Sequence, residues 1–202
     1  PSQKEIRPLV KNLLIDRFKL KTHVESREMD VYDLVLARSD GRLGPDLKPS
    51  KSDCSNADEL AAKRAEALAK GDLASILPKP GEAMACAIVP NLSGGPANIS
   101  MHGDGQEMKQ LIEQLTQLTG RYIRDKTGLT GRYDFDMKLD LQQLLAVARG
   151  MGLNVPAGAE ANLPQSDGSS LTTALKEQLG LKLDSVRAPV DVLVIDSVEA
   201  PT

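Results

Sequence analysis

The sequence predicts an α+β fold in which repeated helix–strand–strand units form mainly antiparallel sheets packed against helices. Amphipathic helical patterns alternate with apolar strand patterns, and clusters of turn residues separate them. The helix-to-strand junction at residues 13–21 resembles that at residues 175–183, because in both a helix leads directly into a Leu-Lys strand. The return strands at residues 31–36 and 190–195 also correspond. We therefore predict an internal repeat.

Residues 1–40 form the first predicted helix–strand–strand unit. Residues 6–15 have the helical period, with Pro8 in the first turn, where the missing N–H costs nothing. The apolar side chains of one helical face are Leu9, Val10, Leu13 and Leu14. Apolar and β-branched residues at 18–24 and 31–37 then predict two strands.

Residues 41–96 read as a loop-rich insertion that contains one Ala-rich helix. Asn56 followed by Glu59 has the spacing of a capping box, and Gly71 ends the helical pattern. A short apolar run at residues 84–89 follows a second loop. Because the insertion has few large apolar residues, we expect it to need another source of stability.

Residues 97–202 contain a strand–helix–strand–strand unit and a closing helix–strand–strand unit. In the first, Asp104 is the predicted cap of a helix, with Glu107 three residues later, and Gly120 ends that helix. The other predicted segments, in chain order, are strands at 98–102, 121–124 and 132–139, a helix at 141–148, a linker at 150–169, a helix at 171–179, and strands at 181–186 and 190–198. Helices that precede hairpins cannot bury their own apolar faces, so we expect the units to share one core.

Composition and charge argue against two classes of protein. The chain has 202 residues, a net charge of −3, 2% aromatic residues and no Trp, whereas nucleic-acid binding needs clustered cations and stacking platforms. No apolar run approaches the roughly 18 residues of a membrane span. One basic stretch comprises Lys4, Arg7, Lys11, Arg17, Lys19, Lys21 and Arg27, interrupted by Glu5, Asp16 and Glu25. We interpret it as an ordinary solvated face.

A six-residue stretch at 125–130, DKTGLT, resembles the phosphorylated-aspartate motif of cation-pumping ATPases. Gly103-Asp104-Gly105 resembles the metal-binding loop of the same family. In those pumps the Gly-Asp-Gly motif lies downstream of the aspartate, whereas here it lies upstream. The Lys-Thr-Gly sequence also suits a hairpin turn by itself, so we predict a structural role.

The two histidines, His23 and His102, have no metal-ligand spacing, so we predict no metal or cofactor site. Alternation along a strand places Asp134 and Asp136 on one face. These four residues are the candidates for a hydrolase site assembled in space. No Gly-x-Ser-x-Gly nucleophile motif occurs, and we predict that the protein is not an enzyme.

Cys54 and Cys86 are the only cysteines, and they flank the Ala-rich helix. A disulfide between them would close a loop of about thirty residues and contribute roughly 3.5–4 kcal/mol by the chain-entropy relation. We predict this disulfide, and with it an oxidising compartment. Two unrelated buried thiols are the alternative.

Five stretches together resemble a soil-associated family of bacterial proteins of unknown function. They are DRFKLK (16–21), SREMDVY (26–32), GPDLKPS (44–50), DKTGLTGRYDF (125–135) and APVDVLVID (188–196). The resemblance runs along nearly the whole chain and implies export; some members resemble outer domains of membrane metallopeptidases of the β-lactam-sensor type. It implies no catalytic residues. It also implies a further strand-rich section before the first helix, so we expect a chain truncated at its N-terminus.

The element order of residues 98–139, with Thr130-Gly131 between strands, is more loosely similar to the short N-terminal periplasmic domains of secretins and TonB-dependent receptors. Those domains bind other proteins. This resemblance rests on element order and is an analogy.

These observations predict a periplasmic or secreted binding or sensory module that acts through protein–protein contacts with an envelope or membrane protein. Exposed edge strands at residues 31–37 or 190–198 are the expected docking sites, because an edge offers unpaired backbone groups. The alternatives are the hydrolase around His23, His102, Asp134 and Asp136, and a purely structural spacer.

Overall fold

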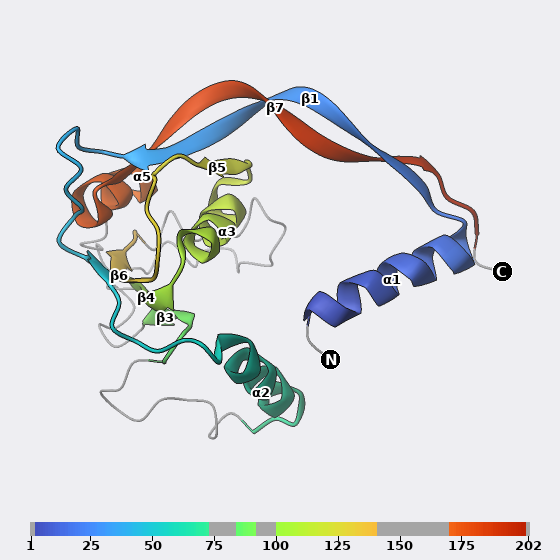
Figure 1. Cartoon of the computed structure of the whole chain (residues 1–202), viewed down its shortest axis with the longest axis horizontal. Coiled ribbons are helices and arrows are strands. Elements are labelled where there is room, and N and C mark those ends of the chain that lie inside the picture. The colour runs from blue at the N-terminus through green and yellow to red at the C-terminus, as the bar shows by residue number, and fades with distance from the viewer. Residues whose placement is uncertain (1–2, 73–83, 92–99, 141–169, 201–202) are drawn as a thin grey trace, which may run out of the picture. The chain divides into compact units, whose positions relative to one another are not determined.

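The computed structural model describes residues 3–72, 84–91, 100–140 and 170–200 (Figure 1). Its elements are α1 (Gln3–Phe18), β1 (Lys21–Leu36), β2 (Leu47–Pro49), α2 (Ala57–Ala69), β3 (Ile88–Asn91), β4 (Ser100–Gln106), α3 (Met108–Thr119), β5 (Ile123–Asp125), β6 (Tyr133–Lys138), α5 (Leu171–Ala174), the π-helical turn η2 (Leu175–Leu179) and β7 (Leu181–Ser197). The predicted α+β class is confirmed. The helix and linker predicted at 141–148 and 150–169 lie outside the described residues.

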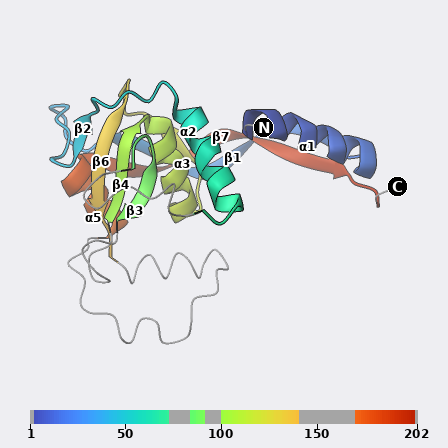
Figure 2. The same cartoon turned by 90° about the horizontal axis from the view of Figure 1, so that it is seen from below.

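Four strands form an antiparallel sheet in the order β2-β6-β4-β3, and they lie side by side in Figure 2. Along β6 the side chains of Tyr133, Phe135 and Met137 are buried, whereas those of Asp134 and Asp136 are half-buried. This alternation is typical of a strand with one face on a core and the other toward solvent.

A second sheet has the order β5-β1-β7 and contains the two longest strands. Hydrogen bonds from Ala37 N to Gly180 O and from Glu199 N to Phe18 O, each 2.8 Å, join opposite ends of β1 and β7, so these strands run antiparallel. β5 is parallel to β1 and pairs only with its segment from Tyr32 to Leu34.

β1 and β7 correct the sequence-based prediction, which divided each of them into two strands. The structure has one continuous strand at residues 21–36 and another at 181–197. The polar residues taken for turns need not form turns, because each strand pairs with a remote partner that holds it extended. Residues 31–37 are consequently not an edge: β1 lies between β5 and β7. The middle section keeps the order helix–strand–strand (α3, β5, β6), but an internal repeat is not shown.

The chain divides by contacts into two compact units. The first unit contains residues 1–30, 58–76 and 187–202, and the second contains residues 31–57 and 77–186. β1 and β7 each contribute residues to both units. The three successive sections predicted from the sequence remain a prediction.

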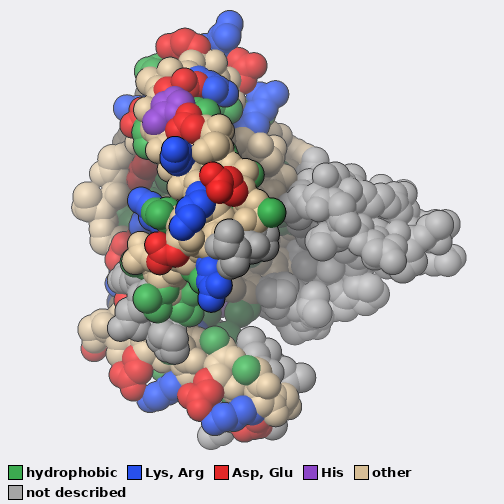
Figure 3. Space-filling view, turned by 90° about the vertical axis from the view of Figure 1, so that its right-hand side faces the viewer, with side chains coloured by type: hydrophobic (Ala, Val, Ile, Leu, Met, Phe, Trp, Pro, Cys, Tyr) green, Lys and Arg blue, Asp and Glu red, His purple; other side chains and the backbone are tan. Residues whose placement is uncertain are grey.

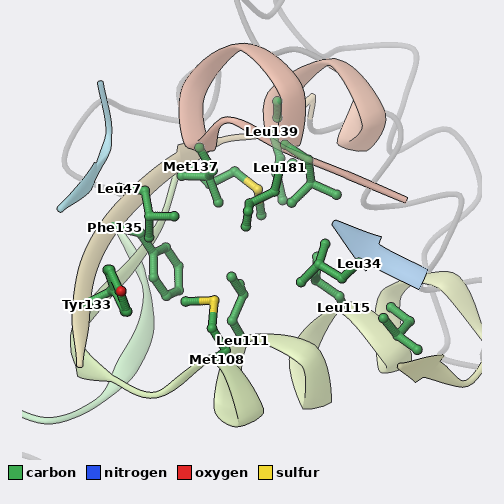
Figure 4. Close-up of a cluster of buried hydrophobic side chains, with 14 residues drawn as sticks. Leu34, Leu47, Met108, Leu111, Leu115, Tyr133, Phe135, Met137, Leu139 and Leu181 are labelled. Carbon is green, nitrogen blue, oxygen red and sulfur yellow. The ribbon is translucent and has the colours of Figure 1, made fainter. Parts of the chain in front are cut away.

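The apolar core belongs to the second unit and lies between α3, η2 and the sheet that contains β6 (Figure 4). α3 contributes Met108, Leu111 and Leu115, which recur every three to four residues and therefore share one face. Among the buried apolar side chains of the described residues, only that of Ala188 belongs to the first unit. Among its described residues, the first unit therefore has almost no apolar core of its own.

Two helix starts differ from those predicted. α3 is capped by Glu107, whose N–H donates to Gln110 Oε1 at 2.8 Å, whereas the predicted cap Asp104 lies in β4. α1 begins at Gln3, so Pro8 lies beyond the first turn and removes one backbone hydrogen bond inside the helix. In both cases the helical pattern was correct and the first residue differed.

Candidate functional site

The predicted disulfide between Cys54 and Cys86 is present, with a Cα–Cα distance of 5.6 Å. It lies beside Asp104 of β4 in the second unit. The Asp104 carboxylate accepts hydrogen bonds from Ser52 Oγ (2.7 Å) and from the backbone N–H of Cys86 (2.8 Å). Asp104 therefore ties both cysteine-bearing segments to β4.

The Gly-Asp-Gly sequence in β4 is explained by packing around this disulfide. A Cβ atom on Gly103 would lie 2.2 Å from the Phe135 ring, and one on Gly105 would lie 2.3 Å from Cys54 Sγ. Gly105 also has a φ of +61°, which L side chains rarely adopt. The two glycines are therefore explained by the close packing of β4 against Phe135 and Cys54, and a cation-binding loop is not needed to explain them.

One group of potential metal ligands occurs among the described residues: the side chains of Cys54, Cys86 and Asp104, whose ligand atoms lie within 4.8 Å of one another. Zinc binds the cysteine thiolate. Here the two sulfur atoms are bonded to each other, so this group has no thiolate to offer in the oxidised protein.

The Asp125 motif forms a local turn. Asp125 Oδ1 accepts hydrogen bonds from the N–H (2.9 Å) and the hydroxyl (2.8 Å) of Thr127, and Thr127 Oγ1 accepts one from Leu129 N (3.1 Å). This is the pattern by which Asx and Thr side chains stabilise turns. The carboxylate that would act as a nucleophile in an ATPase is here part of the turn.

The structure brings together part of the residue set considered for a hydrolase. His102 and Asp136 face each other across β4 and β6, with 3.6 Å between Nδ1 and Oδ2. Asp134, on the same face of β6, accepts a hydrogen bond from Gly105 N at 2.8 Å. Among the described residues, neither histidine hydrogen-bonds a serine, threonine or cysteine, so no activated nucleophile accompanies the pair.

His23 belongs to the first unit and has different partners. Its Nδ1 lies 2.7 Å from Asp196 Oδ1, and its Nε2 lies 3.6 Å from Glu25 Oε2. The Glu25 carboxylate also pairs with Arg27, and the Arg27 hydrogen bond lowers the pKa of Glu25 below its ordinary value. The contact between His23 and Asp196 joins β1 to β7.

A bidentate ion pair joins β1 to β5 in the second unit. Arg124 donates from Nε to Asp33 Oδ1 (2.6 Å) and from a terminal nitrogen to Oδ2 (2.8 Å). The hydrogen bond from Arg124 lowers the pKa of Asp33, although partial burial acts in the opposite direction. The Arg121 guanidinium also lies 5.3 Å from the centre of the Tyr32 ring, a second contact of β1. We infer that these contacts help to fix the register of β5 on β1.

The most unusual surface of the chain is apolar and belongs to the first unit. Its exposed large side chains, defined here as the apolar surface, are Ile6, Leu9, Val10, Leu13, Leu14 and Ile15 of α1, Val24 and Met29 of β1, Leu193 and Ile195 of β7, and Val198, which follows β7. Tyr122 is the one exposed large hydrophobic residue of the second unit among those described. Figure 3 shows a face of the molecule on which hydrophobic and charged side chains alternate. So many exposed large apolar side chains in one unit point to an interaction surface, because single exposed residues are normal whereas accumulated ones are not.

Residues 21–30 of β1 have only β7 as a neighbouring strand among the described residues, because β5 pairs further along β1. This part of the sheet is a two-stranded ribbon with two open edges. Isolated two-stranded ribbons are marginally stable in water unless a further strand or a helix covers them. The ribbon therefore offers both unpaired backbone groups and apolar side chains.

Residues 1–198 match the family described as "Protein of unknown function (DUF3738)". The chain belongs to this family. No curated protein and no solved structure matches the DUF3738 chain. The match supports the resemblance to a family of unknown function, whereas a soil origin, export and an association with sensor metallopeptidases remain predictions. Within the described part of this DUF3738 chain, no helix has the length and hydropathy needed to span a membrane.

Sequence reasoning found the apolar face of α1 but predicted that it would lie in a core shared with the sheets. In the structure of this DUF3738 chain, Leu9 is 63% exposed and Leu13 is 53% exposed. Helical periodicity shows that a face is apolar and does not show what covers it. The basic stretch that accompanies this helix was the one signal in the sequence that could have distinguished it from a core helix.

Proposed function

We propose that this chain is an extracytoplasmic, non-enzymatic binding or sensory module that contacts an envelope or membrane protein through the edge of β7. One observation carries the proposal: β7 is an edge strand of 17 residues whose final part exposes Leu193 (67%) and Ile195 (62%). Long apolar edges are normally shortened, covered or charged, because they pair with other chains. β7 has charged residues on both sides of residues 192–195, and this uncharged apolar segment of the edge is suited to strand addition by a partner.

The two kinds of contact have different roles in such a complex. Backbone N–H and C=O groups along β7 would pair with an added strand and provide affinity, whereas Leu193 and Ile195 would select the side chains of that strand. Pro189 also fits this position, because proline is confined to edges, strand starts and bulges. The free edge therefore extends over the residues that follow Pro189.

The disulfide supports the proposed compartment, because bridges of this kind persist in oxidising environments. The test is to trap thiols with acid in the native organism and alkylate them before and after reduction. We expect Cys54 and Cys86 to react only after reduction. Alkylation of both residues without reduction would contradict an extracytoplasmic location.

The docking edge is tested with a photo-crosslinking amino acid placed at Leu193, and at Tyr122 as a matched exposed position in the second unit. We expect one envelope protein to be crosslinked from position 193 and not from position 122. Adding Ile195→Lys should reduce that product about tenfold or more, because a charge replaces an apolar contact. Equal products from both positions, or a product that Ile195→Lys leaves unchanged, would exclude the β7 edge as the docking site.

A further inference from the structure

We infer that α1 is a lipid-surface site: its apolar face docks on a membrane surface rich in anionic lipids. The inference uses a different element from the proposed protein contact and stands independently of it. It rests on the exposure of the α1 face and on the charge of the segment that carries it, and no side chain of α1 whose burial the structure describes belongs to the core.

α1 carries four exposed apolar side chains at neighbouring positions on its surface. Leu9 and Leu13 are four residues apart and therefore lie on the same side, next to Val10 and Leu14. Each of these side chains is exposed, and none belongs to the buried core. Arg17 lies on the same side, about 40° around the helix from Leu13 and about 20° from Val10. An interfacial helix buries its apolar side chains among headgroups and acyl chains and keeps its basic side chains at the headgroups.

The charge of the same segment complements an anionic surface. Residues 1–24 contain six Lys or Arg and two Asp or Glu, a net charge of +4 in a chain of net charge −3, so the remaining residues carry −7. Lys11, Lys19 and Lys21 are exposed and form no ion pair with any residue that the structure describes. Lys11 lies about 60° around the helix from Leu14, so it borders the apolar face at less than one helix diameter (~10 Å), within the Debye length near 0.1 M salt.

The charge also argues against a symmetric contact between two copies of α1. A two-fold interface places the same patch of both copies face to face. Two segments of +4 would then oppose each other, and like charges brought together reduce affinity. An anionic bilayer instead gains from each Lys near its surface.

The experiment uses the purified full chain and sized vesicles, with flotation as the readout. Vesicles of phosphatidylcholine alone are compared with vesicles that contain phosphatidylcholine and phosphatidylglycerol in equal amounts. We expect at least tenfold tighter binding to the anionic vesicles near 0.1 M NaCl, and loss of most of that difference near 1 M, where the Debye length is about 3 Å.

Two pairs of variants separate the apolar and the ionic contributions. Leu9→Ser with Leu13→Ser should weaken binding at least tenfold, whereas Ile15→Ser, about 160° around the helix from Leu13, should change it less than about twofold. Lys11→Gln with Lys21→Gln should weaken binding about tenfold or more. The same charge change at exposed Lys109 and Lys176 of the second unit should have little effect.

Far-UV circular dichroism of each variant verifies that the fold is retained, which we expect because Leu9 and Leu13 are exposed and not in the core. Three results would overturn the inference. The first is that the chain binds neither kind of vesicle. The second is that it binds both kinds equally and that the lysine variants bind as the wild type does. The third is a dimer in sedimentation velocity that dissociates when Leu9→Ser and Leu13→Ser are introduced together. The last result would assign the apolar face to a second copy of the chain.

Discussion

Replacing Leu111 by alanine in α3 and Leu13 by alanine in α1 should have very different effects on the free energy of unfolding. Both leucines lie inside helices, and alanine is the best helix former, so helix propensity does not separate the two variants. Leu111 is fully buried in the core of the second unit, whereas Leu13 is 53% exposed in the first unit. The pair therefore measures whether apolar side chains of the two units have the same role.

The magnitudes follow from burial. Truncating Leu111 removes a fully buried side chain and leaves a cavity, which costs about 3 kcal/mol within the usual range of roughly 2–5 kcal/mol. Truncating Leu13 removes a side chain that is already about half in water and leaves no closed cavity, so the cost should stay below about 1 kcal/mol. For a chain of this length, about 3 kcal/mol lowers the melting temperature by roughly 6–12 °C.

Urea unfolding followed by far-UV circular dichroism measures both values, because the chain has no Trp to report by fluorescence. The midpoint for Leu111→Ala should fall clearly below that of the wild type, and the midpoint for Leu13→Ala should stay close to it. If Leu13→Ala costs as much as Leu111→Ala, then the α1 face is covered by protein in solution. Both the assignment of that face to the surface and its docking on lipid would then be wrong.

Three further outcomes are expected. Gly105→Ala should lower stability by more than about 1 kcal/mol, because the added Cβ meets Cys54 Sγ and the backbone is left-handed. Replacing both Cys54 and Cys86 by alanine should lower the free energy of unfolding by roughly 3–4 kcal/mol, because the disulfide spans 32 residues. Asp33→Asn should destabilise the protein near neutral pH and much less in acid. The pKa of Asp33 is lowered by Arg124, so its contribution is present above the ordinary Asp pKa and is lost as pH falls through the lowered value.

Each of these outcomes has a control. In a protein with alanine at both cysteine positions, Gly105→Ala should lower the free energy of unfolding only by the cost of its left-handed backbone. If the loss is as large as in the wild type, contact with the sulfur atom is not its cause. Reductant should lower the urea unfolding midpoint of the wild type and leave the midpoint of the double-alanine variant unchanged. The Asp33→Asn difference should be measured from pH 7 downward; a difference that persists at pH 2 would assign the loss to packing rather than to charge.

Several local features were predictable because they depend on neighbouring residues. The period of α3, the Gly120 helix end and the turn after Asp125 depend on side chains within a few positions of each other. The disulfide was predictable because the chain has only two cysteines. Continuous β1 and β7 were missed because a remote partner, and not local turn propensity, keeps both strands extended.

Among the candidate site residues, the sequence placed Asp134 and Asp136 on one strand face, but only the register of β4 on β6 set His102 opposite Asp136. The hydrogen-bond partner of His23 could not be predicted from its strand pattern, because that partner, Asp196, is 173 residues away in the chain. The sequence alone determined the α+β class, the cysteine pair and the amphipathic character of α1. Tertiary structure decided that Leu111 is buried whereas Leu13 faces outward, since burial depends on which elements pack together and helical period does not.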